Sequence, residues 1–244
     1  MVAEGLSCWI FGLKRMERPV RVRGARNIGL REGRSKTARG PFPPPGLPRG
    51  SGAMPPSPPR FWLDVVDPLS DLVEAELQAL EEQGLEPVRR SALELRPPPQ
   101  QLLDPDGASW TDRWSRAAEL AAGLDLPLRE QPLVPWSRKA HELLLHAREV
   151  HREREVRTAV LHAFHRQGRD VGRVDILVDL ATSLGLDRTR TKAVLDVDRH
   201  ATAVADAARE ARGLGATAPP ALWTGTELVQ GFHNRDALRT LLIP

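Results

Sequence analysis

The sequence is poor in cysteine and has no long apolar run. Of its 244 residues only Cys8 carries a thiol, which excludes an internal disulfide, a cysteine-rich metal site and a dithiol redox pair. No stretch approaches the roughly 18 consecutive apolar residues of a membrane-spanning helix. The apolar stretch 5–13 is followed rather than preceded by its charges, which is the wrong order for a secretory signal. We therefore expect a cytoplasmic protein without a membrane partner.

Positive charge is concentrated in the first 60 residues. Residues 1–60 hold 12 Lys and Arg against 3 Asp and Glu, a net charge of +9, whereas the other 184 residues carry −6. The same segment contains 10 Pro and 9 Gly, which interrupt helices and strands. We predict a disordered basic tail over 1–60 and one domain over 61–244. An arm that binds nucleic acid or anionic lipid is the alternative. Such arms usually carry denser Lys and Arg runs, so no nucleic-acid partner is expected.

The periodicity of apolar residues in 61–244 predicts strands at both ends and helices between them. Strands are predicted over 61–66 and 88–95, joined by a helix that begins at Pro68 and stops at Gly84. Strands over 221–224 and 227–230 precede a closing helix through Leu242. The helices expected between them are 110–124, 137–151, one from Val156 that Gly168 ends, 174–184 and a long alanine-rich helix over 194–213. This order predicts an α/β thioredoxin-like fold, β-α-β plus β-β-α, with an all-helical insertion over about 107–214.

Asp67 and Ser70 lie where the first predicted strand meets its helix. Asp67 suits the N-cap, and Pro68 suits the first helical position, where a missing N–H costs nothing. Capping by itself explains both polar residues and stabilises the helix by about 1 kcal/mol. A chemical role is the alternative, because a helix N-terminus presents unpaired N–H groups and a partial positive charge.

Four stretches resemble the DsbA-like thioredoxin family, within its branch of 2-hydroxychromene-2-carboxylate isomerases and FrnE-type proteins. They are Phe61–Leu72, Ser137–His141, Ala163–Leu180 and Gly215–Ala221. The first is similar to the family's first strand and active-site turn, in which Asp-x-x precedes Cys-Pro-x-Cys or Ser-Pro-x-Ser. The second and third are similar to segments of the family's helical insertion. The fourth resembles its cis-proline turn, and the likeness covers roughly 61–244.

The resemblance implies a site between the first helix and the cis-proline turn. Asp67 and Ser70 stand where redox members have their two cysteines. In the isomerase branch a serine handles the thiolate of bound glutathione, so the resemblance implies glutathione or another low-molecular-weight thiol as cofactor and a small molecule as substrate. The implied ligand-binding residues are Pro68, Leu69, Ala218, Pro219 and Pro220.

The sequence departs from the family pattern at both walls of this site. Neither Asp67 nor Ser70 can exchange disulfides, and a carboxylate at position 67 would repel an arriving thiolate. Pro219 has no N–H to pair with a ligand backbone. Two functions stay open. One is a thiol-cofactor-linked isomerase or transferase in which Asp67 is a general acid or base and Ser70 orients the ligand. The other is a catalytically degenerate binding module.

Five histidines lie on two neighbouring predicted helices. A metal site needs three or four converging ligands with fixed supporting partners. Arginines follow several of these histidines and would repel a cation. We therefore expect no metal site and interpret the five as solvated or partly buried. They are His141, His146, His151, His162 and His165.

Overall fold

The computed structural model describes residues 57–243, and within them lies a four-stranded sheet. Its strands are β1 (Arg60–Leu63), β2 (Arg89–Ala92), β3 (Ala221–Trp223) and β4 (Leu228–Gln230), in the order β2-β1-β3-β4. β1 runs parallel to β2 and antiparallel to β3, which is antiparallel to β4. A parallel pair needs a crossover, and helix α1 (Pro68–Glu82) supplies it. The predicted β-α-β half and β-β half are both confirmed.

The predicted tail falls almost entirely outside the described residues. Arg60, the last residue of the predicted tail, lies in β1. Within 57–243, no helix is long and apolar enough to cross a membrane.

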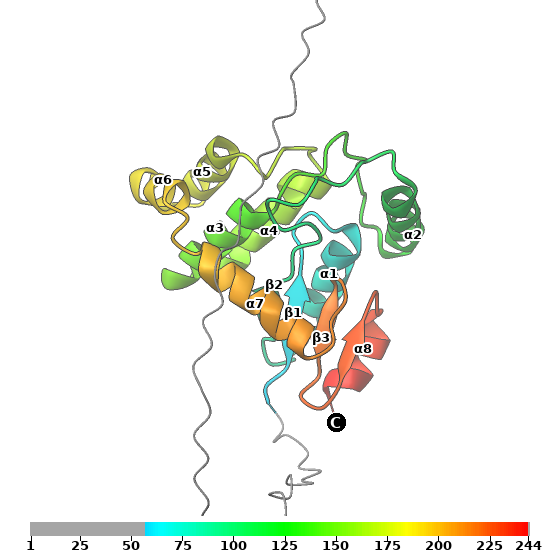
Figure 1. The fold of residues 1–244 in the computed structure, drawn as a ribbon. Helices are drawn as coiled ribbons and strands as arrows, with labels where there is room; N and C mark the ends of the chain where they lie inside the picture. The colour runs from blue at the N-terminus through cyan, green and yellow to red at the C-terminus, as the bar shows by residue number, and fades with distance from the viewer. Residues whose placement is uncertain (1–56, 244) are drawn as a thin grey trace, which may run out of the picture. The chain divides into compact units, whose positions relative to one another are not determined.

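Helices cover both faces of the sheet (Figure 1). On one face, α1 and α8 (Arg235–Leu242) pack Leu77 and Leu238 against Phe61 of β1. On the other face, α7 (Ala201–Gly213) packs Ala208 against Trp62. Adjacent residues of a strand point to opposite faces, so β1 contributes to both cores and is buried on both sides. Burial on both faces explains why the sequence of this strand is a continuous apolar run.

Both strands of the β-α-β half are shorter than predicted. The run 61–66 stays extended only to Leu63, and 88–95 only over Arg89–Ala92. The side chain of Asp64 ends the pairing, because its Oδ1 accepts from the N–H of Val66 at 3.3 Å and its Oδ2 from that of Leu95 at 2.7 Å. An aspartate that bonds the nearby backbone competes with a strand ladder.

The insertion consists of helices, as predicted. They are α2 (Ala108–Leu124), α3 (Arg138–Glu149), α4 (Glu153–His165), α5 (Val174–Ser183), α6 (Arg188–Asp196) and α7. Buried apolar side chains from α3, α4 and α5, among them Leu143, Phe164 and Leu177, form a separate core. Val65 and Val66, which follow β1 in the chain, also pack in this core. The segment that leaves β1 therefore connects the sheet to the helical insertion.

The long helix predicted over 194–213 is wrong, because α6 ends at Asp196 and α7 begins at Ala201. Between them Asp198 has a left-handed backbone (φ 53°). Lys139 of α3 pairs with Asp198, and Glu142 accepts from the N–H of His200 at 3.1 Å. These tertiary contacts compensate a conformation that costs an L-residue about 1–2 kcal/mol. No glycine or proline marks the break.

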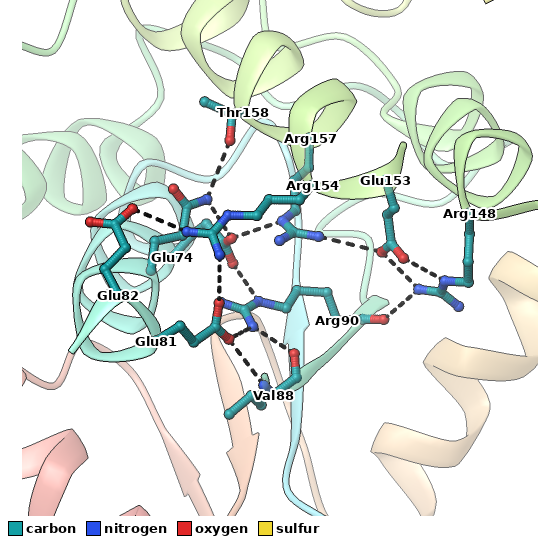
Figure 2. A network of polar contacts seen from close by, with 11 residues as sticks. Glu74, Glu81, Glu82, Val88, Arg90, Arg148, Glu153, Arg154, Arg157 and Thr158 are labelled. Atoms are coloured by element: carbon teal, nitrogen blue, oxygen red, sulfur yellow. Dashed lines mark hydrogen bonds and ion pairs between the residues drawn. The ribbon is translucent and has the colours of Figure 1, made fainter. Parts of the chain in front are cut away.

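A buried ion network ties the insertion to the β-α-β half (Figure 2). Glu74 of α1 accepts from Nε of Arg90 in β2 at 2.9 Å and from Nε of Arg157 in α4 at 2.8 Å. Arg90 also pairs with Glu81 of α1. All four side chains are buried, so this contact between the two parts of the domain is ionic rather than apolar.

Candidate functional site

The turn between β1 and α1 holds Asp67 as a helix cap whose acceptor oxygens are occupied. Asp67 is fully buried. Its Oδ1 accepts from the N–H of Leu69 at 3.3 Å, and its Oδ2 from the N–H of Ser70 at 3.0 Å. The hydroxyl of Ser70 donates to the same Oδ2 at 2.6 Å and accepts from the N–H of Asp64 at 3.3 Å. The capping interpretation is confirmed, and Ser70 is as fully buried as its partner.

Arg113 of α2 bridges the helix cap and the cis-proline turn. Its Nε donates to Oδ1 of Asp67 at 2.5 Å, and its Nη2 donates to the carbonyl of Pro219. The peptide bond between Pro219 and Pro220 is cis. Burial lowers the pKa of Arg113, but the carboxylate of Asp67 more than offsets it, so the pKa lies above its ordinary value. One guanidinium therefore joins the two walls of the predicted site.

The implied ligand-binding residues lie around this ion pair, and most of them are buried. Pro68 and Leu69 are buried, and Leu69 packs against Ala117 and Ala121 of α2. In the opposite wall Pro219 and Pro220 are buried as well, and only Ala218 is partly exposed. The carbonyl of Pro220 accepts from the N–H of Gly231 at 2.9 Å. The predicted residues thus come together, but both proline carbonyls are already used inside the protein.

Two buried histidines of the insertion contact the residues before Asp67. Nε2 of His141 lies 3.4 Å from Oδ1 of Asp64. Burial raises the pKa of Asp64, but His141 and the N–H of Leu95 outweigh it, so this pKa lies below its usual value. Nε2 of His165 donates to the carbonyl of Val65 at 3.0 Å, and burial lowers the pKa of His165. The expectation of solvated or partly buried histidines is wrong for both, and also for His146 of α3, which is buried as well.

Sequence reasoning missed Arg113 altogether. It is one of many arginines, and the sequence of α2 carries no motif around this residue. The packing of α2 over Leu69 and Leu72 places Arg113 at the turn.

The polar groups of this turn do not form a set of three candidate metal ligands. The one such set within residues 57–243 lies on α3 and at the start of α7: His146, Glu149 and His200.

Comparison with known proteins identifies the fold and the family. The profile of the DSBA-like thioredoxin domain matches residues 60–242. A curated relative, the uncharacterized protein YwbO of Bacillus subtilis (strain 168), is 28% identical over 148 residues, which are 59% of this chain and 74% of that protein.

Solved structures share the fold at lower identity. A probable DsbA oxidoreductase from Streptomyces coelicolor superposes with a TM-score of 0.63 and 23% identity, over 75% of this chain and 87% of that one. A 2-hydroxychromene-2-carboxylate isomerase gives 0.62 and 17%, over 76% and 92%. Because the family profile covers nearly all of residues 57–243, this chain belongs to the DSBA-like thioredoxin domain family.

Proposed function

We propose that this family member performs no thiol chemistry at the α1 turn and acts as a binding module. One observation carries the proposal. Asp67 stands at the first cysteine position, is fully buried, and accepts hydrogen bonds from two backbone N–H groups, Ser70 and Arg113. The carboxylate and the guanidinium occupy the place where a thiolate and a ligand backbone would bind.

Electrostatics support this interpretation. A helix N-terminus stabilises one negative charge, and Asp67 already supplies it. A second anion beside a buried carboxylate is repelled, and that repulsion is strong where solvent is excluded. Dithiol exchange also needs two sulfurs at the turn, and Asp67 and Ser70 supply none.

The test is a pair of measurements on the full chain. We expect no reduction of a model disulfide such as insulin by dithiothreitol above the uncatalysed rate. We also expect no chemical-shift change of the Leu69 and Ser70 amides on titration with millimolar glutathione. Catalysed disulfide reduction, or saturable shifts at these amides, would overturn the proposal.

A second candidate is an isomerase or transferase that uses glutathione or another low-molecular-weight thiol on a small-molecule substrate. One observation favours it: the Arg113 side chain is 21% exposed, so a cationic donor is open to solvent between the two walls. Glutathione carries two carboxylates, and Arg pairs well with carboxylates. In this candidate Asp67 would serve as general acid or base, and Ser70 would orient the ligand.

The two candidate functions predict different effects of substituting Arg113 on the glutathione titration. If glutathione binds, Arg113→Met removes the amide shifts, whereas Arg116→Met leaves them, because Arg116 is an exposed arginine on the same helix. Under the first proposal neither variant shows any shift. The same titration therefore separates the two functions.

The proposed location is the cytoplasm, and the proposed partners exclude membranes and nucleic acid. The location rests on the lack of a disulfide framework, because one cysteine cannot form an internal disulfide. The exclusion of nucleic acid rests on the net charge of −6 over residues 61–244, which does not attract a phosphate backbone.

A further inference from the structure

Three side chains with metal-ligating atoms converge on the side of α3 that faces the start of α7. Nδ1 of His146 lies 3.7 Å from Oε2 of Glu149, and Nε2 of His200 lies 3.7 Å from Oε1 of the same carboxylate. All three ligand atoms lie within 4.8 Å of one another. These separations are too long for hydrogen bonds. The two separations of 3.7 Å exceed the spacing of ligands around one small cation only slightly, because metal–nitrogen and metal–oxygen bonds are about 2.0–2.2 Å long.

The two histidine nitrogens need a partner. His146 is only 2% exposed, yet its Nδ1 is buried without a hydrogen bond, and so is Nε2 of His200. Buried polar atoms are nearly always hydrogen-bonded, and an unpaired one costs about 1–3 kcal/mol. An ion that accepts both lone pairs would remove that cost at both atoms.

The fold holds the three groups in place. His146 and Glu149 are three residues apart in the last turn of α3, a spacing that puts them on one face. His200 comes from the break between α6 and α7, which is attached to α3 through Lys139 and Glu142. An unbroken helix over 194–213 would lack these contacts. The unpredicted break therefore creates the convergence.

We propose that His146, Glu149 and His200 form a binding site for a divalent transition metal, Zn²⁺ in the first instance. Imidazole nitrogens favour Zn²⁺ and its neighbours over Mg²⁺ or Ca²⁺. Two histidines and one carboxylate leave room in a tetrahedral shell for a water molecule. A pocket of about 270 Å³, lined by His146, Leu186 and Arg190 among others, lies beside His146. The site lies apart from the α1 turn, so it stands independently of the proposed function.

Two arginines share the carboxylate of Glu149. Arg199 approaches Oε1 at 3.3 Å and Arg190 approaches Oε2 at 3.8 Å. Both side chains are at least half exposed, so they can turn to solvent or keep an outer contact to the bound carboxylate, as supporting partners of metal ligands do. Their charge opposes a cation, and we therefore expect micromolar rather than nanomolar affinity for Zn²⁺. The ion pairs between Glu149 and these arginines still leave Nδ1 of His146 and Nε2 of His200 without a hydrogen-bond partner.

The experiment is calorimetric titration of the full chain with Zn²⁺ after removal of metal with a chelator. We expect one Zn²⁺ per chain. We also expect Co²⁺ to bind there with the visible absorption of a low-coordinate nitrogen–oxygen site. His200→Gln and Glu149→Gln, at partly exposed or exposed positions that tolerate substitution, should each weaken binding at least tenfold.

Matched controls make the outcome decisive. His162→Gln changes an exposed histidine of α4, and Cys8→Ser removes the single thiol; both should bind Zn²⁺ as the parent does. No bound Zn²⁺ at millimolar concentration would overturn the inference. Binding that survives in both His200→Gln and Glu149→Gln, or is lost in Cys8→Ser, would overturn it too. Circular dichroism of each variant ensures that loss of binding is not loss of folding.

Discussion

At the scale of single residues, the feature that sets this chain apart is the bond between Asp67 and Arg113. A cysteine at this position would use the positive end of α1 to stabilise a thiolate. In this chain the carboxylate of Asp67 lies at the positive end of α1, and the guanidinium of Arg113 from α2 neutralises its charge. A charge buried at a helix end is stable only when its partners are complete. Asp67, Ser70 and Arg113 therefore act together as a structural unit.

We predict that Arg113→Met destabilises the protein by about 2–4 kcal/mol, because it leaves the buried Asp67 without its counter-ion. The double variant Asp67→Asn, Arg113→Met should lose less than the sum of the single variants, with a coupling of about 1–3 kcal/mol. Urea unfolding followed by circular dichroism measures all three. Arg116→Met, on the same helix, should stay within about 0.5 kcal/mol of the parent. Additive losses would mean that the two side chains do not interact.

Because His165 is buried, we predict that the free energy of unfolding falls on mild acidification. Burial lowers its folded-state pKa below the unfolded value of about 6.5, so the unfolded chain takes up the proton first. The stability that the neutral ring contributes is complete above pH 6.5. It decreases as the pH falls from there through the lower folded pKa. The free energy of unfolding, measured between pH 7.5 and pH 5, should fall less in His165→Gln than in the parent protein. Equal slopes would contradict this assignment.

At the scale of helices and strands, local signals set several boundaries. Asp67, Asp187 and Asn234 each cap a helix through a side-chain oxygen, and helix starts follow these residues closely. Gly84 has φ 100° just after α1, as its position predicted. Asp125 ends α2 in a left-handed conformation without being glycine. A boundary set by glycine or a cap is visible in sequence, whereas one held by an ordinary residue is not.

This difference gives a paired prediction for helix ends. Asp125→Gly should stabilise the protein by about 0.5–1 kcal/mol, because Asp125 is exposed and glycine adopts its φ of 54° without strain. Gly84→Ala should destabilise it by about 1 kcal/mol. A Cβ at Gly84 would have no atom within 4 Å, so only backbone strain contributes. Thermal unfolding of both variants checks the opposite signs, and a shift of the same sign in both would reject the explanation.

At the scale of the whole molecule, a buried ion network adds to the apolar contacts that join the insertion to the thioredoxin-like part. Burial raises the pKa of Glu74, but the charges of Arg90 and Arg157 outweigh it, so this pKa lies below its ordinary value and the carboxylate is charged at neutral pH (Figure 2). Its two partners come from β2 and α4, on either side of the junction. Buried ion pairs of this kind are costly to break.

We predict that Glu74→Gln destabilises the protein by about 3–5 kcal/mol, because two buried guanidinium groups lose their common counter-ion. Urea unfolding should show this loss in the midpoint. Asp179→Asn, which breaks an exposed pair with Arg188, should leave the midpoint unchanged. A Glu74→Gln midpoint equal to that of the parent would show that this network does not hold the two parts together.

Apart from the break between α6 and α7, the order of strands and helices could be predicted from the sequence, and so could the helix cap at Asp67. The family resemblance implied that the turn at Asp67 faces the Pro219–Pro220 turn, and Arg113 bridges the two. These predictions rest on local periodicity, on capping chemistry and on motifs whose residues are contiguous. Only the tertiary structure decided that Arg113 joins the two walls of this site, that His141 and His165 are buried, and that a break at Asp198 brings His200 onto α3. These features depend on contacts between residues far apart in the chain, and such contacts leave no periodic signal in it.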